Sequence, residues 1–219
     1  MTMTLNTKLF METTPAGAYY TVSSNKQEPA RDLLLNILSE PSLPVLESTR
    51  LSMWSGLQRK ESIELVDRLQ ELGWLSGRES SLSAPDAPLE KVLPKMLEQV
   101  SIEGKALLAD DQGFYLCTSG IAHEAAEALS AVSANLGSLY ERHQRLIVNN
   151  LGIKEQAWTL SNAAGNSQLG FWPLYVGAQR FVLVIQGRPT LNQPAFRDLV
   201  WVLAMRYAKQ IHLQDVSKN

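Results

Sequence analysis

The chain has 219 residues, of which 45% are hydrophobic and 19% are charged, and a formal net charge of -2. This is the balance of an ordinary globular protein, without the global field that would recruit nucleic acid or an anionic membrane. A single cysteine, Cys117, excludes an internal disulfide and a multi-thiolate zinc site within one chain. No signal-peptide core and no apolar run of membrane-spanning length stand out in the sequence, so we expect a cytoplasmic protein with no membrane partner.

The first 29 residues show no sustained periodicity and are rich in Thr, Ser, Asn, Pro and Gly. This composition predicts a flexible N-terminal arm over residues 1–29, in which Leu9–Met11 and Ala18–Val22 could form short extended pieces. The first helical pattern begins after Pro29, where Leu34, Ile37 and Leu38 recur at helical spacing.

Residues 30–79 follow the outline of a small, mainly helical winged-helix-like domain. A Pro-punctuated stretch precedes a strong helical pattern over residues 61–72, which Gly73 ends, and a strand with a turn follows. The run Leu69-Gln70-Glu71-Leu72-Gly73-Trp74-Leu75 resembles the winged helix-turn-helix family at the point where its third helix leads into the wing. Residues 80–88, with Ser, Ala and Pro and no periodicity, are predicted to be a linker.

Residues 89–213 change character and predict an α+β domain, followed by a short tail at 214–219. A helix at 89–100 precedes a hairpin whose strands are 105–109 and 114–119. The pattern continues with a long helix at 122–150, three strands at 155–161, 168–176 and 180–186, and a final helix at 193–212. The order α-β-β-α-β-β-β-α predicts an antiparallel five-stranded sheet with helices packed against it.

Together with this order, the segment Gly104-Lys105-Ala106-Leu107-Leu108-Ala109-Asp110-Asp111-Gln112-Gly113-Phe114-Tyr115-Leu116-Cys117-Thr118-Ser119-Gly120 resembles the roadblock / dynein light-chain family. The related GAF and PAS sensor domains show a similar hairpin pattern and stay open as an alternative. The roadblock resemblance implies a profilin-like α+β fold and a protein that is not an enzyme. It also implies dimers that align an edge strand and the long middle helix, and small Ras-like GTPases among the partners.

No constellation for catalysis, cofactor binding or metal binding stands out. The nearest approach to a phosphate loop, Gly187-Arg188-Pro189-Thr190, lacks the required lysine and favours a turn. His123, His143 and His212 lie too far apart in the sequence to predict a metal site. Cys117 alternates with apolar residues on a predicted strand, which favours a packed thiol over a nucleophile. We therefore expect neither an enzyme nor a cofactor.

DNA binding by the winged-helix-like domain is possible but disfavoured. The predicted third helix carries mainly acidic side chains, which the phosphates of a DNA groove would repel. A weak phosphate-facing rim is left, formed by Arg50, Arg59, Lys60 and Arg78. We expect this domain to be a protein-interaction module.

The long helix at 122–150 offers a candidate dimer face of small and apolar side chains, Ala125, Ala128, Val132 and Leu136. Packing of these residues inside one chain is the alternative. Free sheet edges promote aggregation, and symmetric edge pairing removes that hazard, so we expect a homodimer. The aromatic residues Trp158, Phe171, Trp172 and Tyr175 are expected in the core rather than in a ligand pocket.

The leading hypothesis is therefore a non-catalytic, dimeric adaptor or regulatory protein that binds a protein partner, with a small Ras-like GTPase as one candidate. A first alternative is a transcription regulator with a winged-helix DNA-binding segment and a dimerising or ligand-sensing GAF-like C-terminal domain. A second is a GAF-like sensor of a small molecule, bound between sheet and helices.

Overall fold

The computed structural model describes residues 9–208 and divides them into two compact units. The first unit contains residues 9–86, 176–178 and 192–208, and the second contains residues 87–175 and 179–191. The chain first passes from the first unit to the second after Asp86, inside the linker predicted at residues 80–88. The end of the predicted last helix, His212, and the predicted tail at 214–219 lie outside the described residues.

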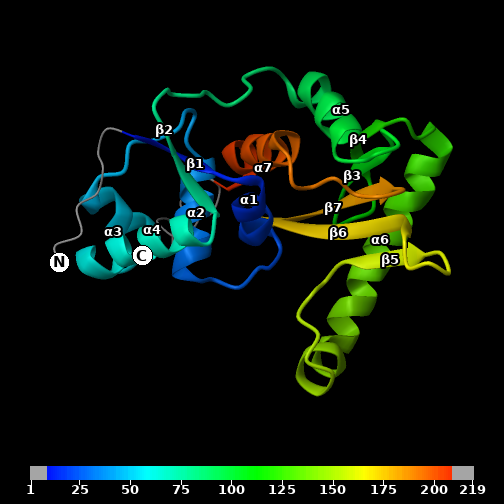
Figure 1. Ribbon diagram of the computed structural model, residues 1–219. Coiled ribbons are helices and arrows are strands. Elements are labelled where there is room, and N and C mark those ends of the chain that lie inside the picture. Colours follow the sequence, from blue (N-terminus) through cyan, green and yellow to red (C-terminus); the bar gives the residue numbers. More distant parts are fainter. Residues whose placement is uncertain (1–8, 209–219) are drawn as a thin grey trace, which may run out of the picture. The chain divides into compact units, whose positions relative to one another are not determined.

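The first unit is mainly helical, with one small sheet (Figure 1). Its elements are β1 (Phe10–Thr13), α1 (Pro15–Val22), α2 (Pro29–Leu38), α3 (Ser48–Ser55), α4 (Arg59–Glu71), β2 (Leu75–Arg78) and α7 (Pro194–Tyr207). The strands β1 and β2 pair antiparallel, with Phe10 opposite Arg78.

Residues 1–8 of the flexible arm expected over 1–29 lie outside the described residues, and residues 10–22 form β1 and α1 rather than a flexible segment. Thr14 caps α1, because its hydroxyl accepts a hydrogen bond from the Gly17 amide at 3.1 Å. Met11, Ala18 and Val22 are buried. The segment is too short for its periodicity to show in the sequence, and tertiary burial orders it.

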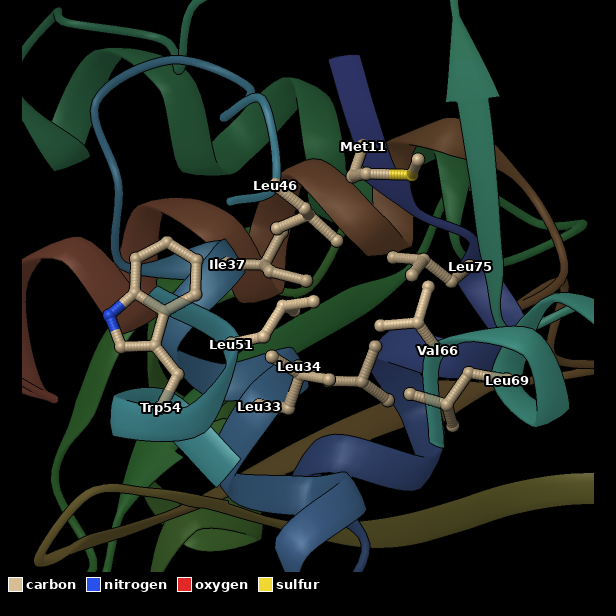
Figure 2. Packing of buried hydrophobic residues seen from close by; sticks show 10 residues of the cluster. All are labelled: Met11, Leu33, Leu34, Ile37, Leu46, Leu51, Trp54, Val66, Leu69 and Leu75. Atoms are coloured by element: carbon tan, nitrogen blue, oxygen red, sulfur yellow. The ribbon is translucent and has the colours of Figure 1, made fainter. Parts of the chain in front are cut away.

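The core of the first unit is built from the apolar stripes that the sequence predicted on α2 and α4 (Figure 2). These stripes pack against β1, β2 and α3 through a buried cluster, Met11, Leu33, Leu34, Ile37, Leu46, Leu51, Trp54, Val66, Leu69 and Leu75. Burying side chains of this size stabilises a fold by about 1.5–3 kcal/mol each.

The helices α3 and α4 form a helix-turn-helix. Gly56 ends α3 in the left-handed conformation, with φ 69°, and two further residues lead into α4. The strand β2 pairs with the upstream β1 and not with a downstream wing strand. The winged-helix assignment therefore stays a prediction. The predicted linker is partly held in place, because the Leu43 amide donates to the Leu82 carbonyl at 2.9 Å and Ala84 is buried.

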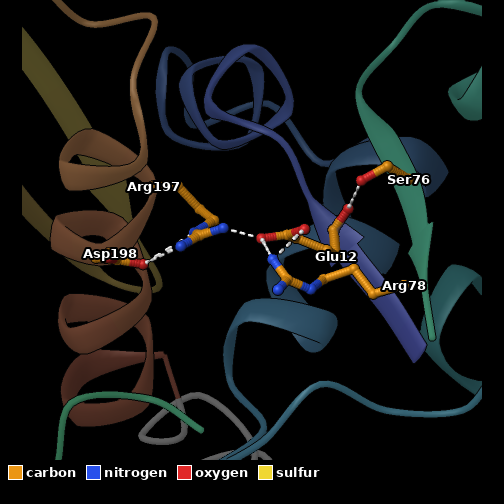
Figure 3. Close-up of polar contacts among 5 residues, drawn as sticks. All are labelled: Glu12, Ser76, Arg78, Arg197 and Asp198. Atoms are coloured by element: carbon orange, nitrogen blue, oxygen red, sulfur yellow. Dashed lines mark hydrogen bonds and ion pairs between the residues drawn. The ribbon is translucent and has the colours of Figure 1, made fainter. Parts of the chain in front are cut away.

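A buried ionic cluster joins α7 to the small sheet (Figure 3). Arg197 bonds to Glu12 and to Asp198, and Glu12 also accepts from Arg78 at 3.3 Å. The indole N–H of Trp201 donates to the Glu40 carbonyl at 2.8 Å. The last helix, expected within the domain at 89–213, thus belongs to the first unit. Apolar residues cover almost the whole circumference of α7. The sequence pattern of such a helix does not show whether it packs on the sheet or among the helices of the first unit.

The second unit holds an antiparallel five-stranded sheet in the order β4-β3-β7-β6-β5. Its elements are α5 (Leu89–Gln99), β3 (Ala106–Asp110), β4 (Tyr115–Ser119), α6 (His123–Gln144), η1 (Arg145–Asn150), β5 (Trp158–Ser161), β6 (Ser167–Val176) and β7 (Gln179–Gln186). With α7, the observed element order is the predicted α-β-β-α-β-β-β-α, and the predicted α+β class is confirmed.

Strand alternation separates the two faces of this sheet. Leu107 and Ala109 of β3, with Val182 and Val184 of β7, pack in one cluster with Ala126 of α6. Cys117 of β4 lies opposite Leu108, which points to the other face, where Glu90 of α5 comes close enough to influence the thiol. The helix α6 therefore packs on one face of the sheet. The side of α6 that points away from the sheet is exposed.

Candidate functional site

The helix α6 is the longest element in the described part of the chain, with 22 residues. Its inner side is buried at Ala126, Ser130, Ser133 and Tyr140. The small inner residues let the helix lie close to the sheet, and both serines satisfy their hydroxyls on the helix backbone, Ser130 on the Ala126 carbonyl at 2.8 Å.

Its outer side carries an exposed row that we call the α6 stripe. The members are spaced alternately by three and four residues, the spacing of positions a and d in a coiled-coil heptad. They are Ala125, Ala128, Val132, Asn135, Leu139, Arg142 and Leu146, the last of these already in η1, and all seven are exposed. Val132, Leu139 and Leu146 are 44%, 39% and 50% exposed, large values for apolar side chains on a long helix.

The structure separates the predicted dimer face into two sets. Ala125, Ala128 and Val132 lie on the α6 stripe, whereas Leu136 packs into the cluster between helix and sheet. Leu139 continues the stripe in its place. A step of three residues from Val132 to Asn135, rather than of four to Leu136, is the signal that the sequence interpretation missed.

The strand β5 is an edge of the sheet and lies on the same flank of the unit as the α6 stripe. It pairs on one side with β6, Trp158 opposite Phe171, and no described strand pairs with its other side. Leu160 in the middle of β5 is 64% exposed. Leu136, which borders the stripe, packs in one cluster with Trp158, so the stripe faces the β5 side of the helix.

The far end of α6 has no covering layer in the described structure. No residue from Glu141 to Glu155 is buried, and Figure 1 shows this end of α6 with η1 projecting beyond the strands. Leu151 and Ile153 are 61% and 47% exposed there. The segment η1 is a π-helix, a rare form that is frequently found at functional sites.

Charge is unevenly distributed along α6. Its first turns carry Glu124 and Glu127, while Arg142 and Arg145 stand at its far end. Each sign lies at the helix end whose dipole favours it. The outer surface is therefore acidic and small at one end, and basic and bulky at the other.

No protein-family model matches the sequence, and no curated protein matches it. Solved structures with a similar arrangement include a Roadblock/LC7 domain from Streptomyces avermitilis, with 13% identity and a TM-score of 0.36, over 58% of this chain and 99% of that one. Myxococcus xanthus MglB gives 14% identity and 0.33, over 57% and 95%. The gliding protein MglB from Thermus thermophilus gives 18% and 0.36, over 55% and 87%. Likeness at these values assigns no function to this chain.

Three of the four cations in the predicted phosphate rim form ion pairs with carboxylates. Arg50 pairs with Glu40 at 3.4 Å, and its guanidinium also lies 4.7 Å from the centre of the Trp54 ring. The other ion pairs are Lys60 with Glu64 at 3.8 Å and Arg78 with Glu12 at 3.3 Å. Arg59 is exposed at the start of α4. The structure therefore does not gather these four cations into one open anion site.

Cys117 and His123, which the sequence raised as candidates for catalysis or metal binding, have neighbours that favour a structural role. Burial raises the pKa of the Cys117 thiol, which disfavours the reactive thiolate. The Tyr115 hydroxyl lies 2.6 Å from His123 Nδ1, and His123 Nε2 lies 3.5 Å from Glu127 on an exposed surface. Residues 9–208 contain no group of three or more His, Cys, Asp or Glu that could hold a metal ion.

The predicted aromatic group divides between the two faces of β6. Phe171 and Trp172 are buried, on opposite sides of the strand, while Trp158 and Tyr175 are half-buried and face the α6 side with Phe171. In the part of the chain that the structure describes, no helix is both long and apolar enough to cross a membrane.

Proposed function

We propose that this protein is a non-catalytic, homodimeric adaptor or regulatory protein, and that two copies join through the α6 stripe and the edge of β5. The observation that carries the proposal is the α6 stripe itself, seven exposed residues at heptad spacing on one helix. An exposed seam of this kind is stable in water when a second helix covers it.

Side-chain size favours an antiparallel pairing of the two helices. With Asn135 beside its own copy, Val132 of one chain meets Leu139 of the other. In the same register, the small Ala125 meets the bulky Leu146. Parallel helices would instead place Leu146 beside Leu146 and leave Ala125 facing Ala125, with a gap at one end. Size complementarity of this kind is what close packing requires.

Charge favours the same orientation. An antiparallel pair brings Glu124 and Glu127 of one chain close to Arg142 and Arg145 of the other. A parallel pair would place each acidic end beside an acidic end. Complementary charge at such positions selects partner and orientation more than it adds affinity.

Pairing of β5 with its copy fits the same twofold axis. The free backbone groups of an edge strand invite another strand, and symmetric pairing satisfies them and closes the assembly. The exposed Leu160 on that strand would be covered in the process. An oligomer that closes in this way also protects the chain from open-ended aggregation.

A protein partner is the second part of the proposal, and a small Ras-like GTPase is the class that we propose. The support is the resemblance of residues 104–120 to the roadblock family. Small GTPases of the same genome, loaded with a non-hydrolysable GTP analogue or with GDP, can be tested for binding to the immobilised full chain. Binding that depends on the bound nucleotide supports this class of partner, and its absence across the set contradicts it.

The dimer is tested by the solution mass of the full chain, measured by light scattering on a sizing column at micromolar concentration. We expect about twice the 24.3 kDa of one chain. Val132→Glu combined with Leu139→Glu buries four like charges at the seam, so this variant is expected at the mass of one chain.

Ser138→Glu is the matched control, because Ser138 is exposed on α6 but lies outside the stripe. It should keep the dimer mass. A monomeric wild-type chain contradicts the proposal, and so does a double variant that remains dimeric.

A further inference from the structure

The apolar surface of the α6 stripe continues beyond the end of α6. Leu151 and Ile153, in the turn that follows η1, are 61% and 47% exposed. With Leu146, which is 50% exposed, they form an apolar surface that we call the η1 cap. Exposed apolar side chains that gather at one place mark a surface that another molecule covers.

Backbone hydrogen bonds hold the residues of the η1 cap together. The Leu151 amide donates to the Leu146 carbonyl at 3.1 Å, and the Ile153 amide donates to the Ile147 carbonyl at 3.1 Å. Between them Gly152 takes the left-handed conformation, with φ 70°, which closes the turn at the end of the helix. The η1 cap is therefore a compact end of the helix.

The π-helical turn determines which residue continues the stripe. In an α-helix, the heptad spacing after Leu146 would lead to Asn149, a polar residue. The bond from Leu151 to Leu146 spans five residues, as in a π-helix, and places Leu151 directly beyond Leu146 along the helix axis. The wider turn thus puts an apolar side chain, and not a polar one, at the end of the seam.

In the antiparallel dimer, the η1 cap of one chain reaches the start of α6 in the other chain. With Asn135 at the centre and a rise of about 1.5 Å per residue, η1 lies level with residues of about 120–125 in the second copy. Ala122 and Ala125 are exposed there, and Ile121 is partly buried. Small and apolar side chains therefore lie at the level that the η1 cap reaches.

The charges at the two ends of α6 fit the same contact. Arg145 and Lys154 flank the η1 cap, and Glu124 lies in the first turn of α6. All three are exposed, and none of them forms an ion pair with another residue of the part that the structure describes. Glu124 and Arg145 lie about 30 Å apart along one helix, so only a second copy brings these charges together.

We propose that the η1 cap of each copy packs on Ile121, Ala122 and Ala125 of the second copy, with Arg145 and Lys154 beside Glu124 of that copy. The occupant of the cap is a second copy of this chain, because both the small residues and the carboxylate lie where the cap arrives. The inference rests on the proposed antiparallel dimer and extends its interface beyond the paired helices. Twofold symmetry provides the contact twice in each dimer.

The contact is tested in the full chain by Ala122→Cys combined with Leu151→Cys, in a Cys117→Ala background, with a short bismaleimide cross-linker. The two new cysteines lie about 43 Å apart along one helix, so the reagent cannot join them within a chain. We expect a covalent dimer on a denaturing gel. Ala122→Cys alone and Leu151→Cys alone should give none, because each position lies about 40 Å or more from its own copy.

Leu151→Asp tests the apolar part of the contact. Sedimentation of the full chain over a concentration series should show a dimer dissociation constant at least about tenfold higher, because each dimer loses two apolar contacts and buries two unpaired charges. Ile102→Asp is the matched control, since Ile102 is 60% exposed but follows α5, away from the η1 cap in the sequence. It should keep the dissociation constant of the wild type.

The pattern of results separates this contact from the dimer itself. If Asn135→Cys cross-links with the same reagent and Ala122→Cys with Leu151→Cys does not, the dimer stands and the cap contact is contradicted. Equal dissociation constants for Leu151→Asp and Ile102→Asp also contradict it, and they leave the η1 cap open to a different partner or a lipid surface. If neither cysteine variant cross-links, both the dimer and the contact are contradicted.

Discussion

Arg197 places a cation in a buried position of the first unit, where its charge needs partners. Its side chain is 9% exposed and bonds to Glu12, itself 11% exposed, and to Asp198. Glu12 is shared with Arg78, so one carboxylate holds two guanidinium groups (Figure 3). Such a cluster fixes geometry more than it adds stability, because desolvation offsets much of the attraction between the charges.

Removal of Arg197 should therefore destabilise the protein more than removal of a surface cation. Breaking a buried ion pair from one side costs about 3–5 kcal/mol, and Arg78 remains to satisfy Glu12, so we expect about 2–3 kcal/mol for Arg197→Met. Urea unfolding of the full chain measures this change. Arg188→Met, at an exposed position, should cost less than about 0.5 kcal/mol. A small loss in Arg197→Met, equal to that of the control, would contradict this role.

The sequence predicted the exposure of some residues at the candidate site correctly and of others incorrectly. Ala125, Ala128 and Val132 were predicted on an outer face, and they are exposed. Leu136 and Leu139 are both leucines three residues apart on one helix, and their letters do not say which faces the sheet. A Cβ at Gly137 would lie 2.8 Å from Arg180 Cζ, and this close approach left no sequence signal, because it depends on a strand far along the chain.

At the scale of elements, long periodic segments were predicted well. The helix predicted at 122–150 appears as α6 and η1 together, and the strands of the second unit lie within about three residues of their predicted ends, an error typical of element boundaries. The short extended piece expected at Leu9–Met11 overlaps β1, whereas the one expected at Ala18–Val22 lies in the helix α1, which was missed because eight residues are too few to show a period. Their order comes from contacts with residues far along the chain, such as the Thr14 hydroxyl on the Gly73 carbonyl at 2.6 Å.

The charge on the exposed surface of α4 bears directly on whether the first unit binds DNA. Its exposed surface includes Glu61, Glu64 and Glu71 against Arg59, Lys60 and Arg68, and Lys60 is paired with Glu64. A groove-binding helix needs cations for the phosphates and donors for the base edges. On α4 the exposed cations do not outnumber the exposed carboxylates, so the helix-turn-helix of α3 and α4 does not carry the basic surface that is typical of DNA-binding helices.

We therefore expect no binding of a short fluorescent DNA duplex at about 10 μM protein, a concentration inside the range of about 1–100 μM over which non-specific DNA binders are half-saturated. Fluorescence anisotropy at low salt measures this. Glu61→Lys combined with Glu64→Lys should raise the affinity, which shows that the assay can detect binding through α4. Salt-dependent binding by the wild-type chain would instead favour the transcription-regulator alternative.

At the scale of the whole molecule, the chain passes between its two units more than once. The first unit takes in residues 176–178 and 192–208 as well as the N-terminal 9–86. Sequence order suggested two consecutive domains, and it could not show that α7 returns to the first unit through contacts of Phe196 with Tyr19 and of Trp201 with Glu40. Experiments on assembly accordingly need the full chain, because a cut near Pro88 would uncover this helix.

In the proposed dimer, two copies pair through antiparallel α6 helices with Asn135 at the centre. The chain has one cysteine, so a Cys117→Ala background lets a new cysteine report its own neighbours. The measurement is disulfide formation under mild oxidation in Asn135→Cys, read as a covalent dimer on a non-reducing gel. A disulfide requires Cα atoms within about 7 Å, which this register provides across two closely packed helices.

We predict a cross-linked dimer for Asn135→Cys and none for Ser138→Cys, which lies off the stripe. We also predict none for Ala125→Cys alone, since that position would lie about 30 Å along the helix axis from its copy. A mixture of Ala125→Cys and Leu146→Cys chains should cross-link with each other. An efficient Ala125→Cys homodimer would show parallel helices, and the absence of any cross-link at Asn135→Cys would contradict the proposed interface.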